Sequence, residues 1–365
     1  MKVGTVVGAR PQFIKAAAVS RALRSVGDVQ EVIIHTGQHY DANMSEVFFQ
    51  ELEIPKAGHH LGIGSDSHGA QTGRMLEALE QVLLNEKPDQ VLVYGDTNST
   101  LAGALAAAKL QIPVSHIEAG LRSFNRRMAE ETNRILTDHL STLLFAPTDA
   151  AVVNLRREGI STEKIHRVGD VMYDAALYHG AKAEATSRIL HRLGLKAKHY
   201  SLVTVHRAET TDTPARLHAV TKGLCQASGH MQWVFPVHPR TRTALMRDSL
   251  LEDLSKCVQV IEPVGYLDMV MLEKNSCCIA TDSGGVQKEA FFYRVPCVTL
   301  REETEWVELV ELGWNRLVSP TDSEAVAKVL SDSSTGARAC RVDPGDLYGD
   351  GHAAERIAGI LLMSS

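Results

Sequence analysis

The part of this chain best suited to bind a phosphate is the segment at residues 277–289. It begins as a short apolar run, which predicts a buried strand, and turns at Ser283, Gly284 and Gly285 into a pattern with helical spacing. Serine is a favoured residue before a helix, and two glycines let a ligand approach the backbone closely. A helix start offers N–H groups to an anion, and Glu289 follows about one and a half turns later, within reach of a sugar diol. An ordinary strand-to-helix turn has the same composition, so the interpretation depends on what else converges here.

Carboxylates and one histidine supply candidate acid–base groups. Asp96 and Glu118 each follow an apolar run, where a carboxylate is unfavourable unless it is paired or used. Helix capping explains Asp96 equally well, whereas Glu118 caps no obvious helix. Of the adjacent Glu130 and Glu131, one is expected to be a solvated charge at a helix start. His206 also ends an apolar run, which makes it a candidate acid, base or phosphate donor.

Arg10 and Lys15 are the cations best placed to meet a phosphate. Both follow the first apolar run and a glycine, around a helix start that has Pro11 in its first turn. They could clamp phosphates from the N-terminal half of the chain while residues 283–285 hold them from the C-terminal half. A role as ordinary surface cations stays open for each residue taken alone.

Composition argues against several classes of function. A formal net charge of -6 over 365 residues gives no reason to expect nucleic acid or an anionic membrane as the main partner. No stretch approaches the length of a membrane-spanning helix, and the first residues predict a strand rather than a signal peptide. The six cysteines form no CxxC pair and the sixteen histidines no HExxH pattern, so no metal site is expected. Buried free thiols indicate a reducing cytoplasm.

Short apolar runs alternate with helical patterns along the whole chain, which predicts an α/β fold with parallel sheets covered on both faces. The two series of runs indicate two Rossmann-like domains facing across a cleft, at residues 1–175 and 176–350. A final helix at 351–365 is expected to pack back on the first domain. The expected strands lie at residues 2–7, 31–35, 90–94, 113–116, 143–146, 165–168, 201–205, 232–235, 258–261, 277–281 and 297–300.

The candidate residues lie where such a fold would bind a ligand. In open parallel sheets, ligands bind beyond the carboxyl ends of the strands, and a cleft between two sheets is a common site. Charged residues or glycines follow the expected strands at 8–10, 95–97, 116–120, 206–207, 237–240 and 282–285. Chance turns do not readily explain so consistent a pattern.

These motifs, taken in order, resemble the non-hydrolysing UDP-N-acetylglucosamine 2-epimerases. The resemblance covers essentially the whole chain. It implies two Rossmann-like domains in the glycosyltransferase-B arrangement, a homodimer, and catalysis without nicotinamide or metal. The matching motifs are Gly8-Ala9-Arg10-Pro11-Gln12-Phe13-Ile14-Lys15, Gly95-Asp96-Thr97-Asn98-Ser99-Thr100, residues 116–122, Glu130-Glu131-Thr132-Asn133-Arg134, His206-Arg207, residues 281–289 and Tyr348-Gly349-Asp350-Gly351.

The resemblance also implies roles for individual residues. The positions that match the family's catalytic carboxylates and its histidine are Asp96, Glu118, Glu130 and His206. The positions that match its binding site for the UDP diphosphate and ribose are Arg10, Lys15, His206, Ser283, Gly284, Gly285 and Glu289.

The sequence departs from the commoner family pattern in places that bear on the substrate. Gln12 stands where glutamate is usual, Ala129 replaces a proline, and Trp306 replaces an arginine. Met269 lies where an aromatic residue often stacks on uracil. These changes resemble the subgroup that acts on UDP-2,3-diacetamido-2,3-dideoxyglucuronic acid. Asp41, in a region where some members bind a second, activating nucleotide sugar, argues against that regulation here.

The reaction that the resemblance implies is epimerisation at C2 of UDP-N-acetylglucosamine to UDP-N-acetylmannosamine, for surface polysaccharide precursors. UDP would leave C1 as the proton leaves C2, and would re-add to the resulting glycal. The diacetamido uronate is the alternative substrate. A glycosyltransferase on the same scaffold is the alternative class, because fold does not dictate chemistry, and a binding module without turnover is a third possibility.

Overall fold

The computed structural model describes residues 1–38, 52–229, 231–334 and 346–364. Residues 39–41, which include the Asp41 of the expected regulatory region, lie outside the described residues. The chain forms two compact units. One comprises Met1–Leu177 with Asp346–Ser365, and the other Tyr178–Gly345. Helix α7 (Val171–Thr186) contributes residues to both units.

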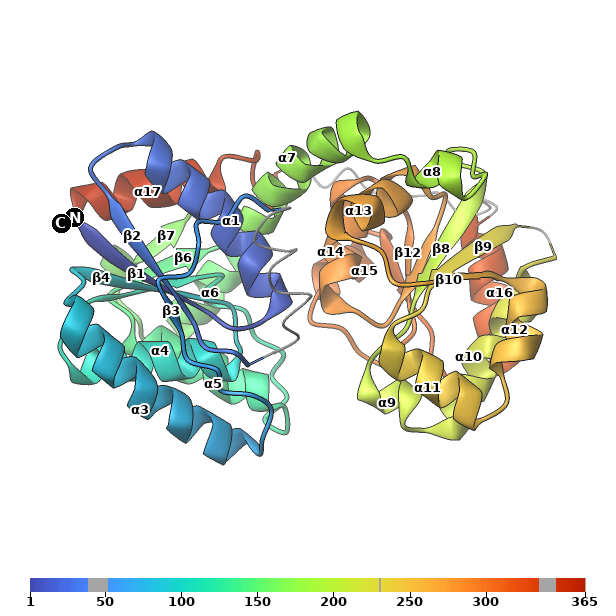
Figure 1. Cartoon of the computed structure of the whole chain (residues 1–365), viewed down its shortest axis with the longest axis horizontal. Coiled ribbons are helices and arrows are strands. Elements are labelled where there is room, and N and C mark those ends of the chain that lie inside the picture. The colour runs from blue at the N-terminus through green and yellow to red at the C-terminus, as the bar shows by residue number, and fades with distance from the viewer. Residues whose placement is uncertain (39–51, 230, 335–345, 365) are drawn as a thin grey trace. The chain divides into compact units, whose positions relative to one another are not determined.

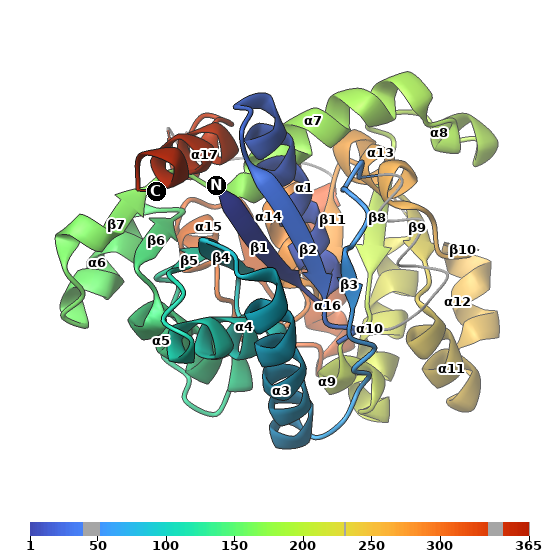
Figure 2. The ribbon, with the colours of Figure 1, turned by 60° about the vertical axis from the view of Figure 1, so that its left-hand side comes forward.

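The first unit is built on a parallel sheet in the order β3-β2-β1-β4-β5-β6-β7 (Figure 2). The order reverses between β1 and β4, because β1 pairs with β2 on one side and with β4 on the other. The strands are β1 (Lys2–Val7), β2 (Gln30–His35), β3 (His59–His60), β4 (Gln90–Tyr94), β5 (Val114–Ile117), β6 (Leu143–Ala146) and β7 (Ile165–Arg167).

Helices cover both faces of this sheet (Figures 1 and 2). Helices α3 (His68–Glu86), α4 (Asn98–Lys109) and α5 (Ala129–Leu140) pack side by side on one face. Helix α17 (Ala353–Met363), from the end of the chain, packs against α1 (Arg10–Ser25) on the other. Helix α6 (Asp149–Arg157) packs on β6 and β7 and is followed by a short 3-10 turn, Thr162–Lys164.

The second unit repeats the arrangement with a sheet in the order β10-β9-β8-β11-β12-β13, again parallel, which reverses between β8 and β11. Its strands are β8 (Tyr200–Thr204), β9 (Gln232–Pro236), β10 (Gln259–Ile261), β11 (Ile279–Thr281), β12 (Cys297–Thr299) and β13 (Asn315–Leu317). Its further helices are α8 (Ile189–Arg192), α9 (Ala208–Thr211), α10 (Pro214–Ala227), α11 (Pro239–Arg247), α12 (Leu251–Cys257), α13 (Tyr266–Asn275), α14 (Gly284–Phe292), α15 (Val307–Glu311) and α16 (Ser323–Ser334).

Alternate residues of the second sheet belong to two separate hydrophobic clusters. Val203 and Trp233 pack with residues of α10, α11, α12 and α16, whereas the neighbouring Leu202 and Val234 pack with residues of α8, α13 and α14. Successive side chains of a strand point to opposite faces, so the near-continuous apolar runs reflect burial on both faces.

The predicted fold class of two parallel, doubly covered sheets is therefore confirmed. Every expected strand is present, with ends shifted by at most about two residues, as is usual for boundaries. Two edge strands, β3 and β13, were not expected. The first is only His59–His60 and the second, Asn315–Leu317, carries polar residues, so neither has the apolar run that marks a central strand.

The Gln12 side chain links the end of β1 to the end of β4, the two strands between which the strand order reverses. Its side-chain oxygen accepts hydrogen bonds from the backbone N–H groups of Gly8 (2.8 Å) and Ala9 (3.0 Å). Its amide nitrogen donates to the Tyr94 carbonyl (2.9 Å) and the Thr100 hydroxyl (3.0 Å). The side chain is buried and all of these bonds are internal. Position 12 therefore holds two backbone turns together and does not present its amide to a ligand.

Replacing Gln12 by alanine is expected to lower the free energy of unfolding by at least about 2 kcal/mol, because several buried backbone groups lose their partners. Denaturant titration followed by circular dichroism measures the change. Gln30→Ala, at an exposed position of β2, serves as the control and should change stability by less than about 0.5 kcal/mol. Equal effects of the two substitutions would contradict the role assigned to Gln12.

Candidate active site

In both units the candidate residues lie at the reversal of strand order, where open α/β sheets bind ligands. In the first unit, β1 leads into the turn before α1, and β4 leads through Gly95 and Asp96 into α4. In the second unit, β8 is followed closely by His206, and β11 leads into Ser283 and α14.

Lys15 and Glu118 form a buried ion pair in the first unit. The Lys15 ammonium donates to the Glu118 carboxylate, and both side chains are less than a tenth exposed. Glu118 has a positive φ of 72°, a conformation that costs a non-glycine residue about 1 kcal/mol or more. Gly95 beside the pair also has a positive φ, and a Cβ there would lie 3.2 Å from each charged group. The close packing fixes two candidate residues beside the end of β4.

Asp96 is held by a second ion pair in the same unit. The Arg134 guanidinium donates to one oxygen of Asp96 through Nε (3.0 Å) and a terminal nitrogen (2.6 Å). Burial raises the pKa of Asp96 above its ordinary value, as does the charge of Glu118, although Arg134 and Lys15 act in the opposite direction. The side chain remains 32% exposed, so the carboxyl group is partly desolvated and still accessible. Such a group is suited to proton transfer, because its proton is easier to retain than that of a solvated carboxyl group and it can still reach a ligand.

The structure separates the roles of Glu130 and Glu131. Glu131 is buried and accepts hydrogen bonds from the backbone N–H groups of Ser123 and Phe124 and from Arg134. Burial works against its ionisation, but these bonds outweigh it and hold its pKa below the usual value. Glu131 thus organises the loop before α5. Glu130, in the first turn of α5, is only half-buried.

A buried charge network, which the sequence did not reveal, supports these strand ends. His116 lies between the Asp138 carboxylate (2.6 Å from Nδ1) and the carbonyl of Gly95 (2.7 Å from Nε2). Asp138 also accepts from Arg122 and from the backbone N–H of Gly120. The network therefore holds the backbone just before Asp96 and on both sides of Glu118. The one signal in the sequence was the placement of His116 just before Glu118.

His206 and Asp282 meet at the reversal in the second unit. The fully buried Asp282 carboxylate accepts from the backbone N–H groups of His206 (3.0 Å) and Arg207 (3.0 Å). The His206 Nδ1 lies 3.7 Å from the same carboxylate, and its side chain is 44% exposed. Burial raises the pKa of Asp282, opposed by the charge of His206 and by the backbone hydrogen bonds. Asp282 thus fixes the backbone that carries an accessible imidazole, a role that its place in a turn motif did not suggest.

The first turn of α14 begins with the two glycines that the sequence singled out. Ser283 is the residue before the helix, as expected, but its side chain caps no N–H group among the described residues. The N–H groups of Gly284 and Gly285 are thus not covered by the serine. Further along α14, the buried Glu289 accepts a hydrogen bond from the Tyr266 hydroxyl (3.3 Å).

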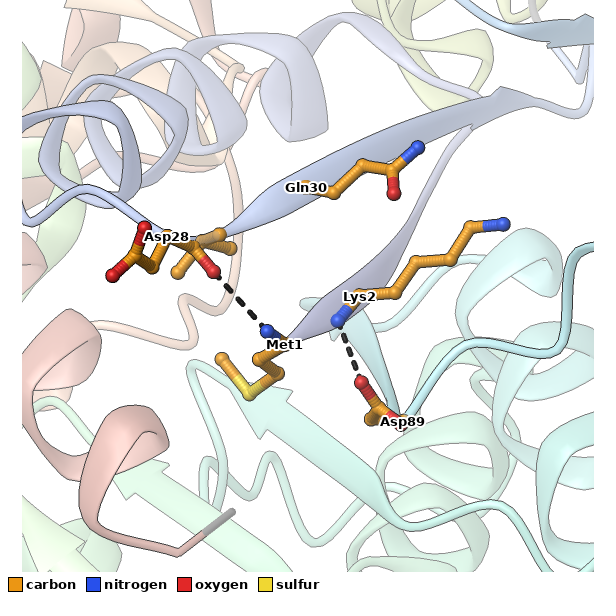
Figure 3. Close-up of a pocket in the computed structure, with 6 residues that line it drawn as sticks. Met1, Lys2, Asp28, Gln30 and Asp89 are labelled. Carbon is orange, nitrogen blue, oxygen red and sulfur yellow. Dashed lines mark hydrogen bonds between the residues drawn. The ribbon is translucent and has the colours of Figure 1, made fainter.

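Arg10 is the first residue of α1, with Pro11 after it, and so follows the end of β1 closely. Among the described residues, no cluster of His, Cys, Asp or Glu could hold a metal ion, and no helix of that part is long and apolar enough to cross a membrane. A surface hollow lined by Met1, Lys2 and Asp89 lies at the opposite, amino-terminal edge of the first sheet (Figure 3). None of the candidate site residues lines it.

Removing the positive charge beside Asp96 should raise the pKa of this carboxyl group further. A nearby cation favours the ionised form, so Arg134→Met is expected to shift the Asp96 titration upward by about one pH unit or more. Carbon-13 NMR of the labelled Asp96 carboxyl group, recorded as a function of pH, measures this pKa. Arg127→Met, which removes an exposed arginine, should leave the titration in place. A pKa that stays constant or falls in Arg134→Met would contradict the coupling.

Comparison with known proteins assigns the chain to a family. A family model described as UDP-N-acetylglucosamine 2-epimerase matches residues 21–362. A UDP-2,3-diacetamido-2,3-dideoxy-D-glucuronate 2-epimerase from Pseudomonas aeruginosa is 51% identical over 99% of both chains. A UDP-N-acetylglucosamine 2-epimerase homolog from Methanococcus maripaludis is 50% identical over 99% of both. A crystal structure of UDP-GlcNAc 2-epimerase from Methanocaldococcus jannaschii, in complex with UDP-GlcNAc and UDP, matches with a TM-score of 0.88 and 45% identity over 100% of both chains. The chain belongs to the UDP-N-acetylglucosamine 2-epimerase family.

Proposed function

We propose that this protein inverts C2 of a UDP-2-acetamido sugar, with UDP-N-acetylglucosamine as substrate and UDP-N-acetylmannosamine as product. The observation that carries the proposal is the cluster of Asp96, Glu118 and Lys15 at the carboxyl ends of β4 and β5. It occurs in a chain that matches the family over nearly its whole length. Paired carboxylates, one of them partly desolvated, are the equipment that proton transfer requires.

The chemistry follows from the acidity of the substrate. The proton at C2 is only weakly acidic, so its removal is coupled to cleavage of the bond between C1 and the UDP oxygen. A base takes the proton, the electron pair of the C–H bond forms a C1–C2 double bond, and UDP departs. The diphosphate oxygen then re-adds to C1 as a proton reaches the opposite face of C2. Two faces require more than one acid–base group, and we assign this chemistry to Asp96, Glu118 and Glu130 together with His206.

The negative charge of departing UDP needs stabilisation at the moment when the bond breaks. Fixed N–H groups and cations supply it most effectively, because they need no reorganisation. We assign this role to Arg10, Lys15 and His206 and to the first turn of α14 at Ser283, Gly284 and Gly285. Glu289, steadied by the Tyr266 hydroxyl, is assigned to the ribose.

A second substrate deserves a direct comparison, because one relative at 51% identity is named for the diacetamido uronate. The structure weakens the argument from position 12, since the buried Gln12 amide is used within the protein. Trp306 is likewise buried and donates to the Gly284 carbonyl. Neither difference places a new charge beside the sugar, so UDP-N-acetylglucosamine remains the first choice.

Epimerisation in heavy water tests the reaction and the substrate together. Each UDP-sugar is incubated separately with the protein, and proton NMR follows the signals of both epimers. The product of the preferred substrate is expected to carry deuterium at C2, because solvent-exchanged groups supply the returning proton.

Retention of the original hydrogen at C2 would point to hydride transfer and reject the mechanism. No epimer without an added acceptor, but transfer of the sugar when one is present, would identify a glycosyltransferase. A preference above about a hundredfold for the diacetamido uronate, equivalent to about 2.7 kcal/mol, would reverse the choice of substrate.

Amide substitutions test the catalytic assignment. Asp96→Asn and Glu130→Gln keep size but remove proton acceptance, so turnover is expected to fall by about a hundredfold or more while UDP still binds. Steady-state kinetics and calorimetric UDP titration measure the two effects. Glu163→Gln, at an exposed position, is the matched control and should keep full turnover. If the two variants lose UDP binding or unfold, these carboxylates are structural.

The proposal extends to a homodimer that works in the cytoplasm on surface polysaccharide precursors. It is supported by the family resemblance, and the free cysteines among the described residues suit a reducing compartment.

A further inference from the structure

Trp306 binds the backbone of the turn at residues 283–285, which is assigned to the diphosphate. Its indole N–H donates to the carbonyl of Gly284 at 3.0 Å, and the side chain is only 6% exposed. Trp306 precedes α15, whereas Gly284 is the first residue of α14. The bond thus joins a loop after β12 to the helix start that is assigned to the diphosphate.

This hydrogen bond also fixes the direction of an N–H group. The peptide bond between Gly284 and Gly285 is trans and planar, so its carbonyl and its N–H point in opposite directions. Gly284 and Gly285 are the first two residues of α14, so the helix already constrains this peptide. The bond from Trp306 adds a second constraint, which holds the Gly284 carbonyl toward the indole and the Gly285 N–H away from it. The added constraint matters here because glycine lowers the stability of a helix.

A buried lysine lies against the tryptophan. The Lys288 ammonium is 4.4 Å from the centre of the Trp306 ring, and Lys288 is fully buried. A cation over an indole face is attracted to it, most strongly when both are shielded from water. The contact therefore helps to hold the indole ring against α14.

Neighbouring contacts hold the same loop in place. The Thr304 hydroxyl donates to Gln287 of α14 (2.6 Å), and Arg301 pairs with Glu305 (2.9 Å). A Cβ on Gly284 would collide with the Glu305 carboxylate, so the loop lies directly against the glycine. The loop and the helix start therefore form one rigid assembly.

We propose that Trp306, steadied by Lys288, is a positioning residue that orients the Gly284–Gly285 peptide toward the diphosphate of the UDP-sugar. The inference rests on the proposed function, because that function places the diphosphate at this turn. Trp306 acts through the backbone and touches no ligand. Its contribution should appear only for ligands that carry the diphosphate.

Trp306→Phe tests the inference, since it keeps a ring over Lys288 and removes only the N–H donor. Calorimetric titration with UDP and with uridine separates the diphosphate from the nucleoside. UDP affinity is expected to fall about five- to tenfold, the size of one hydrogen bond, while uridine affinity stays unchanged. Equal losses for both ligands, or no loss for UDP, would overturn the inference.

Trp314→Phe is the matched control. Trp314 contacts Phe291 at the far end of α14, with ring centres 5.5 Å apart, so the same substitution there should leave the ratio of UDP to uridine affinity unchanged. A change in this ratio equal to that in Trp306→Phe would also reject the special role of Trp306.

Lys288→Met provides a second variant should Trp306→Phe fail to fold. It retains the indole N–H but removes the attraction that steadies the ring, so UDP affinity is expected to fall about two- to threefold with uridine unaffected. Equal losses for both ligands would overturn the inference. The wild-type protein distinguishes this inference from the proposed function. If it binds UDP more tightly than uridine but does not invert C2 of the UDP-sugar, the proposed function is rejected and the positioning role of Trp306 is not.

Discussion

The structure depends on placing charged groups at the buried carboxyl ends of parallel strands. A lone carboxylate at such a place is unfavourable, because burial removes its water without supplying a counterion. Here Glu118 is paired with Lys15, Asp96 with Arg134, and Asp282 with backbone N–H groups at the end of the neighbouring strand β8. Each pairing also fixes the position of the carboxylate. The same contacts that make burial tolerable therefore hold the candidate acid–base groups in place before a substrate arrives.

Much of the fold could be predicted from local pattern. Central strands buried on both faces are continuous apolar runs, so β1, β4, β6 and β8 were located within about one residue. The strands β3 and β13 lack that pattern, because the first consists of two histidines and the second contains Asn315 and Arg316. The charged residues at strand ends could likewise be anticipated, since a parallel sheet brings its carboxyl ends to one edge.

The partners of those residues could not be anticipated. Arg134 reaches Asp96 from another helix, and Asp138 reaches His116 from the same helix as Arg134. Sequence adjacency gave no reason to favour Glu131 or Glu130 as the structural member of their pair. The hydrogen bonds that Glu131 accepts from the backbone of Ser123 and Phe124 distinguish it from Glu130. Local composition indicates which side chains could act as acids, bases or anion-binding groups. Contacts between residues far apart in the sequence determine which of these side chains are already paired within the protein.

Gln12 and Trp306, which both depart from the commoner family pattern, form hydrogen bonds with the backbone. Gln12 binds the turns after β1 and β4, and Trp306 binds the first peptide of α14. Both contacts end on carbonyl or N–H groups beside candidate site residues, so a change of side chain there alters where the backbone lies. Because a displacement of about 1 Å at a reacting group costs about a hundredfold in rate, such positions influence catalysis without facing the substrate. Differences between members of a family at buried positions of this kind are therefore better interpreted through the backbone that they hold than through the charge that they carry.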